Sequence, residues 1–201
     1  MSNTNIKTRK LVEIGMLGAI ATVLMLFEFP IPFIAPPFYE LDFSEVPVLV
    51  GAFALGPMAG ASIELVKILI NLLINGTATA FVGEIGNYLL GCSFIIPAAL
   101  IYKKRKTKKN ALIAMVIGTI VMTVFGCFLN AYILLPTYAT AFGMPIDAIV
   151  GMGSAINANI NDVMTFVIIA VAPFNIIKGI IVSVITLLIY KHISPILKGN
   201  R

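Results

Sequence analysis

A small set of polar side chains interrupts the long apolar stretches of the sequence, and their types suit ligand recognition. An asparagine amide offers both a donor and an acceptor, and a lysine ammonium offers donors alone. Ionisable and amide groups inside apolar helices are costly, so each is a candidate functional residue. The set consists of Glu64, Lys67, Asn71, Asn75, Glu84, Asn87, Asn130, Asn175 and Lys178.

Glu64, Lys67, Asn71 and Asn75 are separated by three, four and four positions, which places them on one stripe of a helix. Two interpretations of this stripe stay open. Glu64 and Lys67 either neutralise each other within a bundle or face a ligand. The two asparagines either join helices through hydrogen bonds or line the same site.

Asn175 and Lys178 form a different pair, because Lys178 has no acidic neighbour within one helical turn. A lysine in apolar surroundings needs acceptors from elsewhere, and a bound ligand can supply them. Counted from the basic end of each expected helix, Lys178, Asn175, Asn87 and Asn130 lie roughly 18 to 30 Å along at 1.5 Å per residue. Separate helices therefore bring amides and one ammonium to a similar depth.

The composition indicates that these helices lie in a membrane. The 201 residues are 59% hydrophobic and 11% charged, with a mean hydropathy of +1.01, whereas soluble domains carry about 25% charged residues. Most of the basic residues behind the net charge of +5 cluster at 7–10, 103–109 and 191–201, beside apolar stretches. This placement is typical of cytoplasmic loops. Because no aromatic residues alternate with the basic ones, we do not expect nucleic-acid binding.

The apolar stretches predict one all-α integral membrane domain with six transmembrane helices. A crossing takes about 20 residues, and the expected helices span about 11–29, 45–55, 57–75, 78–102, 110–135 and 163–191. The N-terminus and the 103–109 run must share the cytoplasmic side, so an even number of crossings separates them. Gly56-Pro57 supplies the necessary break. Both termini are then cytoplasmic, and the second helix, roughly 16 Å long, is too short to cross alone.

Two connecting segments on the outer side are unusual. Residues 30–40 contain four prolines, which predicts a stiff, non-helical, apolar flap. Residues 136–161 are Gly-rich and nearly uncharged, and unstructured loops of this length usually act as lids or binding loops.

The sequence lacks the motifs of catalysis and of metal binding. Cys92 and Cys127 lie in apolar runs without ligand spacing and are expected to be unpaired, and His192 is the single histidine. Nucleophile-elbow, zinc-protease and P-loop motifs are all missing. We therefore expect no catalytic residue, no metal and no cofactor, and any ATP hydrolysis must belong to another subunit.

Small residues cluster in the first helix at Gly15, Gly18, Ala19 and Ala21. Such residues let a second helix approach closely in lipid. They serve either packing within the bundle or docking of a partner membrane protein.

Several motifs taken together resemble one known family over nearly the whole chain. It is the family of riboflavin-specific substrate-binding subunits of energy-coupling factor (ECF) transporters. The motifs are Phe29-Pro-Ile-Pro-Phe, Leu41-Asp-Phe-Ser-Glu-Val-Pro, Phe53-Ala-Leu-Gly-Pro-Met-Ala-Gly, Asn130-Ala-Tyr-Ile-Leu-Leu-Pro and Pro173-Phe-Asn-Ile-Ile-Lys-Gly.

The resemblance implies a multi-pass protein of the cell membrane that binds riboflavin on the outer side. It implies assembly with a membrane coupling subunit and two cytoplasmic ATPases, and release of the vitamin by toppling within the membrane. It assigns ligand contacts to Asn130, Asn175 and Lys178, and Glu40 takes the place where a relative has a threonine. The small residues of the first helix correspond to the alanine-rich docking motif of the family.

The chemistry of a flavin fits these residues. Its ring system is flat and largely apolar with a polar rim, so Phe38, Tyr39 and Leu41 of the flap are expected to cover the ring faces, and Asn87 to join the polar contacts. No pair of basic residues lies in the outer half, which favours an uncharged vitamin.

Two other function classes stay open. A stand-alone secondary transporter of a small apolar or aromatic solute would use Glu64, Lys67 or Glu84 for proton coupling. An intramembrane enzyme is disfavoured by the missing nucleophile–base or metal set.

Overall fold

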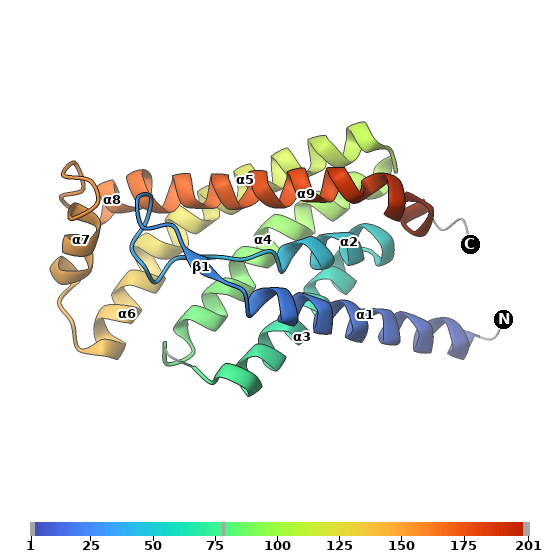
Figure 1. Cartoon of the computed structure of the whole chain (residues 1–201), viewed down its shortest axis with the longest axis horizontal. Coiled ribbons are helices and arrows are strands. Elements are labelled where there is room, and N and C mark those ends of the chain that lie inside the picture. The colour runs from blue at the N-terminus through green and yellow to red at the C-terminus, as the bar shows by residue number, and fades with distance from the viewer. Residues whose placement is uncertain (1–2, 78, 199–201) are drawn as a thin grey trace.

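The computed structural model describes residues 3–77 and 79–198 and is a bundle of long helices (Figure 1). The long helices and the short second helix are α1 (Asn3–Met25), α2 (Glu45–Leu55), α3 (Pro57–Asn75), α4 (Val82–Lys104), α5 (Lys108–Leu129) and α9 (Ala172–Lys198). The remaining elements are β1 (Phe29–Pro30), β2 (Glu40–Leu41), α6 (Leu135–Phe142), α7 (Ile146–Ser154), α8 (Val163–Phe166), and the π-helical turns η1 (Asn130–Leu134) and η2 (Val167–Val171).

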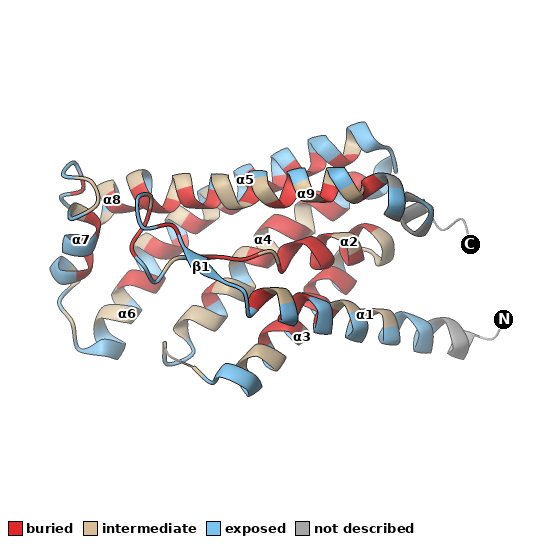
Figure 2. Ribbon diagram, in the orientation of Figure 1, coloured by how far each residue is buried: buried red, intermediate tan, exposed pale blue. Residues whose placement is uncertain are grey.

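Four helical segments are long and apolar enough to cross a membrane. They are Pro57–Asn75, Val82–Lys104, Lys108–Phe142 and Val163–Tyr190. Their outward faces carry exposed hydrophobic side chains such as Leu73 and Leu188, while buried residues lie where the helices face one another (Figure 2). A surface of this kind suits lipid rather than water. The chain is a multi-pass membrane protein.

The short helix α2 is buried among its neighbours. Its core residues include Val48, Leu49 and Phe53, which are at most 3% exposed. The chain turns sharply at Gly56, whose φ of +100° suits a residue without a Cβ, and Pro57 opens α3. This is the break that the sequence predicts, and it lets a segment too short to span the bilayer pack inside the bundle.

The first helix ends at Met25 rather than near residue 29. Beyond it Phe29–Pro30 pairs in antiparallel fashion with Glu40–Leu41 as the β1–β2 ribbon, which the all-α expectation did not include. Pro30 restricts the residue before it to extended backbone, so the apolar run cannot continue as a helix. The ribbon closes the base of the proline-rich segment, which we call the flap (residues 29–41).

The fourth helix begins at Val82 rather than near residue 78, which itself lies outside the described residues. Ala80 and Phe81 have positive φ values of 49° and 67°, a conformation that no helix contains. The Thr77 hydroxyl accepts hydrogen bonds from the backbone N–H groups of Thr79 and Phe81. This side-chain-capped turn delays the start of the helix.

The segment at 136–161 is more ordered than the sequence indicated. The fifth helix continues through η1 into α6 and reaches Phe142, and α7 follows. Pro136 lies at the start of α6, directly after the wide π-helical turn. A proline lacks the N–H and crowds the carbonyl four residues earlier, and here that carbonyl lies inside the wide turn. The proline therefore bends the helix into a new segment instead of ending it.

The described start of α1, the connection between α4 and α5, and the end of α9 lie at one end of the bundle (Figure 1). The flap, α6, α7 and α8 lie toward the other end. The basic clusters are therefore gathered at one end, and the flap is remote from them. Arg201, which belongs to the last cluster, lies outside the described residues.

Candidate functional site

A cavity of about 280 Å³ lies among the flap, α3, α4, α5, η1, α6 and α9. This volume is near the lower end of the range for small-molecule sites. The sequence-predicted residues that line it are Phe38, Tyr39, Glu40, Asn87, Asn130, Asn175 and Lys178. The structure thus brings together residues from the flap and three long helical segments.

Leu41 is the one expected ligand contact that does not line the cavity. It is 1% exposed and belongs to the apolar core formed with Phe166 and Val167. Successive residues of a strand point to opposite faces. Because Glu40 faces the cavity, Leu41 points into the core, and its assignment to the ring-covering residues is corrected.

Glycines on α4 keep one wall of the cavity open. Gly83, Gly86 and Gly91 all line it. A Cβ on Gly86 would lie 2.9 Å from a Leu134 methyl, and a Cβ on Gly91 would lie 2.5 Å from a Glu64 carboxylate oxygen. The helix therefore presents backbone to the cavity at these turns, and larger residues would displace the walls.

The two π-helical turns position the asparagines. Asn130 is the first residue of η1, and η2 ends four residues before Asn175. Pro136 and Pro173 each lie two residues beyond a turn, so both turns accommodate a proline in the same way. A π-helical turn rotates every later side chain relative to a regular α-helix, and such turns are frequent at functional sites.

Asn130 is buried and joins the flap to the fifth helix. Its Oδ1 accepts a 2.6 Å hydrogen bond from the hydroxyl of Tyr39, and its Nδ2 donates to the carbonyl of Gly126 at 2.8 Å. Burial raises the pKa of Tyr39, so the hydroxyl stays protonated and able to donate. The ring of Tyr39 also packs 5.6 Å from that of Phe174. Asn130 keeps one N–H and one lone pair free for a ligand.

Asn175 is a buried polar residue of the cavity wall without a partner among the residues described. Its side chain is 4% exposed and makes no hydrogen bond within the part of the chain that the structure describes. Gly126 makes room for it, because a Cβ there would lie 2.6 Å from the amide nitrogen. A ligand that offers a donor and an acceptor can pair with this free amide.

Lys178 has an acidic partner that its neighbours in the sequence do not supply. Its Nζ lies 3.0 Å from Oδ2 of Asp42, which is 2% exposed, and Oδ1 of Asp42 accepts a hydrogen bond from the N–H of Ser44. Burial opposes ionisation of Asp42, but Lys178, Lys67 and the Ser44 hydrogen bonds outweigh it and hold the pKa of Asp42 at about 2. The counter-charge is therefore built into the protein, and a ligand need not provide it.

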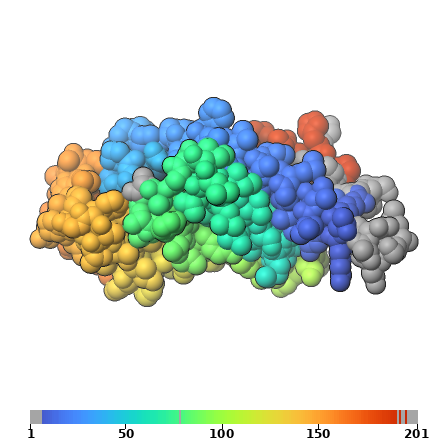
Figure 3. Space-filling model, turned by 90° about the horizontal axis from the view of Figure 1, so that it is seen from below, coloured from blue at the N-terminus to red at the C-terminus, as the bar shows by residue number. Residues whose placement is uncertain are grey.

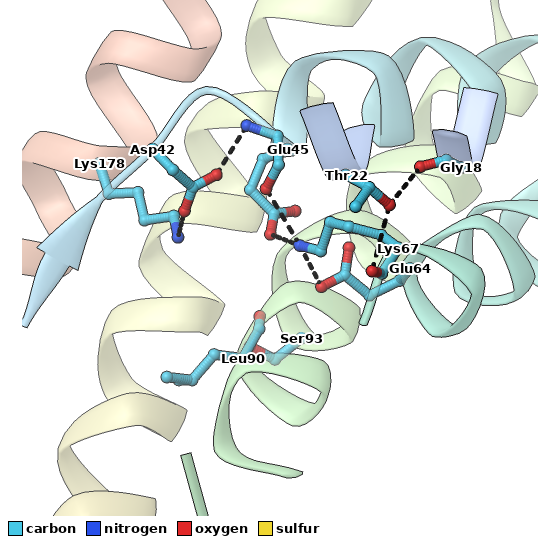
Figure 4. Close-up of polar contacts among 10 residues, drawn as sticks. Gly18, Thr22, Asp42, Glu45, Glu64, Lys67, Leu90, Ser93 and Lys178 are labelled. Atoms are coloured by element: carbon cyan, nitrogen blue, oxygen red, sulfur yellow. Dashed lines mark hydrogen bonds and ion pairs between the residues drawn. The ribbon is translucent and has the colours of Figure 1, made fainter. Parts of the chain in front are cut away.

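A second group of ion pairs surrounds Lys67 (Figure 4). Lys67 is fully buried, and its Nζ lies 2.6 Å from Glu64 and 3.0 Å from Glu45, with the Ser44 hydroxyl at 3.2 Å. Glu64 and Lys67 thus neutralise each other, as one of the two interpretations held. Together with the Asp42–Lys178 pair, these residues provide three carboxylates and two ammonium groups. The ion pairs therefore join α2, α3 and α9.

Asn71 and Asn75 face the cavity rather than a neighbouring helix. Asn75 Nδ2 donates to Asn71 Oδ1 at 3.0 Å, and both residues line the cavity wall. The interhelical bonds that one interpretation assigned to them are not among the hydrogen bonds of the described residues.

Carboxylates surround the opening of the cavity. Glu28 and Glu40 line it without an ion pair among the residues described. Partial burial raises the pKa of Glu28 to about 7, and the nearby charges of Glu40 and Asp42 add to this effect. The opening therefore gains negative charge as the pH rises through neutrality.

Comparison with known proteins assigns the family. The model of the ECF transporter substrate-specific component matches residues 9–190. The riboflavin transporter RibU of Staphylococcus aureus is 38% identical over 96% of this chain and 94% of its own length, and the riboflavin transporter FmnP of Bacillus subtilis is 33% identical over 97% of both. A solved S component of a bacterial ECF transporter has a TM-score of 0.75 and 39% identity, and the match covers 96% of this chain and 99% of that one.

The chain belongs to the family of ECF transporter substrate-specific (S) components. This family consists of transporter components and not of enzymes. Among the described residues, no group of three or more His, Cys, Asp or Glu side chains is arranged to hold a metal ion.

In this S component the small residues of α1 do not form one docking face. A Cβ on Gly18 would lie 2.5 Å from Val66, and Ala21 is fully buried, so both pack within the bundle. Gly15 and Ala19 are exposed, and a Cβ on Gly15 would meet nothing within 4 Å. Figure 3 shows the side chains of α1 adjoining those of α3. Of the four residues predicted to form a docking face, Gly18 and Ala21 are therefore not accessible to a partner, and Gly15 and Ala19 are.

Sequence reasoning left several cavity residues unassigned, among them Glu28, Asp42, Thr79 and Tyr138. One signal was available for Asp42. It lies with Glu40 and Glu45 between apolar segments, and Lys178 is a base without an acidic neighbour in the sequence, so pairing with one of these acids would satisfy it. The others lie at helix ends and turns, where polar residues are ordinary.

Proposed function

We propose that this S component captures riboflavin at the outer side of the cell membrane for ATP-driven uptake. The S. aureus and B. subtilis relatives are named riboflavin transporters and match the chain almost end to end. Both the family and the chemistry of the cavity support a flavin as the ligand.

The unpaired amide of Asn175 carries the proposal. It lies in the cavity wall with Lys178 and Asn130, which have donors and an acceptor to spare. An imide edge of alternating carbonyl and N–H groups matches such a set. Phe38, Tyr39 and Phe174 supply ring faces against which a flat tricycle stacks.

The orientation follows from the placement of charge. The basic clusters at one end of the bundle indicate the cytoplasmic side by the positive-inside rule, and the flap lies toward the opposite end. With α1 and α2 added to the four apolar segments, the chain crosses the membrane region six times and both termini are cytoplasmic. The cavity then opens outward.

ATP hydrolysis for uptake must come from partners, because the sequence has no P-loop. We assign this role to a membrane coupling subunit and two cytoplasmic ATPases. The coupling subunit contacts α1 at Gly15 and Ala19, where a helix can approach closely. Release of the vitamin follows from toppling of the S component within the membrane.

The stand-alone secondary transporter is the weaker alternative. Lys67 already pairs with both Glu64 and Glu45, and Glu84 accepts a hydrogen bond from Thr79 at 2.8 Å. Proton coupling would have to break these contacts. Flavin uptake into vesicles that contain only the purified chain would support this alternative against ours.

The experiment that tests the ligand uses the detergent-purified chain. We expect a yellow protein whose flavin absorption is released on denaturation, and tight quenching of flavin fluorescence when the emptied protein is titrated. Asn175→Leu should weaken binding, whereas Lys104→Met, a change in the basic connection, should not. A folded protein that neither retains nor binds flavin would refute the proposal.

A further inference from the structure

A groove separate from the ligand cavity runs along the outward face between α5 and α9. Its volume is about 480 Å³, and its walls include Leu112, Val116, Ile120 and Val124 of α5 and Ile180 and Val184 of α9. The hydroxyls of Thr119 and Ser183 also reach it, but they donate to carbonyls of their own helices. An occupant therefore meets an almost wholly apolar surface.

The length of the groove matches one leaflet of a bilayer. Leu112 and Val124 are twelve residues apart, which is about 18 Å along a helix. The hydrocarbon core is about 30 Å thick, so one leaflet contributes about 15 Å. The groove begins one turn after Lys108, where α5 starts, and it therefore occupies the half of the membrane next to the basic end.

Basic residues continue the same stripe of α5 beyond the groove. Lys108 precedes Leu112 by four positions, and Leu112 precedes Val116 by four, so all three share one helix face. Lys109 lies three positions before Leu112, and both lysines are exposed. A groove for an acyl chain thus ends in a site of positive charge. Lysines at this position attract anionic lipid headgroups.

We propose that the groove holds an acyl chain of an anionic phospholipid whose headgroup binds Lys108 and Lys109. With the orientation proposed above, the groove lies in the inner leaflet. Lipid binding does not depend on the identity of the transported ligand. A helix of the coupling subunit is the other conceivable occupant. It fits less well, because the lysines at the end of the groove call for an anion and because the exposed small residues lie on α1, which packs on α2 and α3.

Native mass spectrometry of the purified full chain, reloaded with phosphatidylglycerol or phosphatidylcholine, tests the proposal. We expect one phosphatidylglycerol to be retained at least fivefold better than phosphatidylcholine. Lys108→Gln with Lys109→Gln should abolish this preference. The matched control, Lys103→Gln with Lys104→Gln, removes equal charge from the end of α4 and should retain it.

A second pair of variants fills the groove. Val116→Phe with Val184→Phe enlarges two half-exposed walls and should expel the lipid, whereas Leu73→Phe enlarges an 85% exposed residue of α3 and should not. Thermal unfolding of the same samples reports folding without any ligand, so a groove effect is separable from a failure of the proposed ligand.

Equal retention of both lipids, or retention unchanged by the lysine and phenylalanine variants, would overturn the proposal. So would loss of the coupling subunit from the assembled transporter in the phenylalanine variant with lipid retention intact, since the groove would then be a subunit interface.

Discussion

The carboxylate of Asp42 and the ammonium of Lys178 lie 3.0 Å apart although 136 positions separate them in the chain. Asp42 directly follows the flap, and Lys178 lies on the last helix beside Asn175. The pair therefore fixes the C-terminal end of the flap to α9, the helix that carries two of the proposed ligand contacts. Movement of the flap and presentation of the lysine to the cavity are linked through this one contact.

Asp42→Asn tests that link. The substitution keeps the shape but leaves Lys178 without its counter-charge, and removing one member of a buried ion pair costs about 3–5 kcal/mol, less here because Lys178 is partly exposed. We expect a lower unfolding temperature and flavin affinity reduced by roughly tenfold or more.

Asp42→Asn combined with Lys178→Met provides the control for the same pair. Because both changes act on one contact, their effects on stability should be clearly less than additive. Thermal unfolding and fluorescence titration of the four proteins complete the cycle. Additive effects would mean that the two residues act independently.

Asn175→Leu tests recognition by the unpaired amide. The imide edge of the ligand would lose a partner in a site without water, at a cost of about 1–3 kcal/mol, which corresponds to about a 5- to 150-fold loss of affinity. The free protein should be at least as stable as the parent, because the amide has no partner to lose. Unchanged affinity would place the polar rim of the ligand elsewhere.

The sequence was sufficient to predict the membrane bundle, its break at Gly56-Pro57 and seven of the residues that line the cavity. Charge placement and hydropathy decide these features, and both can be read without coordinates. It was not sufficient for the pairing of Lys178 with Asp42, because contacts between distant segments depend on how helices pack. The two π-helical turns were also beyond reach, since they alter the 3.6-residue period on which face assignments rest.

The docking face shows the same limit. One short stretch of the sequence contains Gly15, Gly18, Ala19 and Ala21. Residues three or four positions apart lie on the same face of a helix, whereas residues one or two positions apart lie on different faces. Composition alone does not say which of these faces meets α3. The contact of Gly18 with Val66 does.

Leucine substitutions separate the two faces of α1. Gly15→Leu or Ala19→Leu should leave flavin binding and unfolding temperature nearly unchanged but abolish uptake in cells, because bulk would hold the coupling subunit away. Gly18→Leu should instead destabilise the isolated chain by about 1–3 kcal/mol through overpacking against Val66. Normal co-purification and uptake with Gly15→Leu and Ala19→Leu would exclude this face as the docking site.

Glu84→Gln tests whether capture requires a proton partner in the cavity wall. The carboxylate accepts a 2.8 Å hydrogen bond from Thr79, and a glutamine oxygen can accept the same bond. A neutral vitamin needs no charge there, so affinity should change less than threefold, with at most a small change in stability. Complete loss of flavin binding in the folded variant would instead give Glu84 a direct part in recognition.

Glu28 should make the stability of the protein depend on pH. Its pKa is raised from 4.5 to about 7 in the folded protein by burial and by the neighbouring Glu40 and Asp42. Between these two values the folded state binds more protons than the unfolded state, so the free energy of unfolding falls as the pH rises from about 4.5 to 7. Because Glu28 is partly exposed, solvent screening keeps this effect small. Glu28→Gln should flatten the dependence, and unfolding temperatures measured from pH 5 to 8 in detergent check it. Glu13→Gln, in the middle of α1, is the matched control. Identical slopes for the parent and Glu28→Gln proteins would show that the opening of the cavity does not titrate in this range.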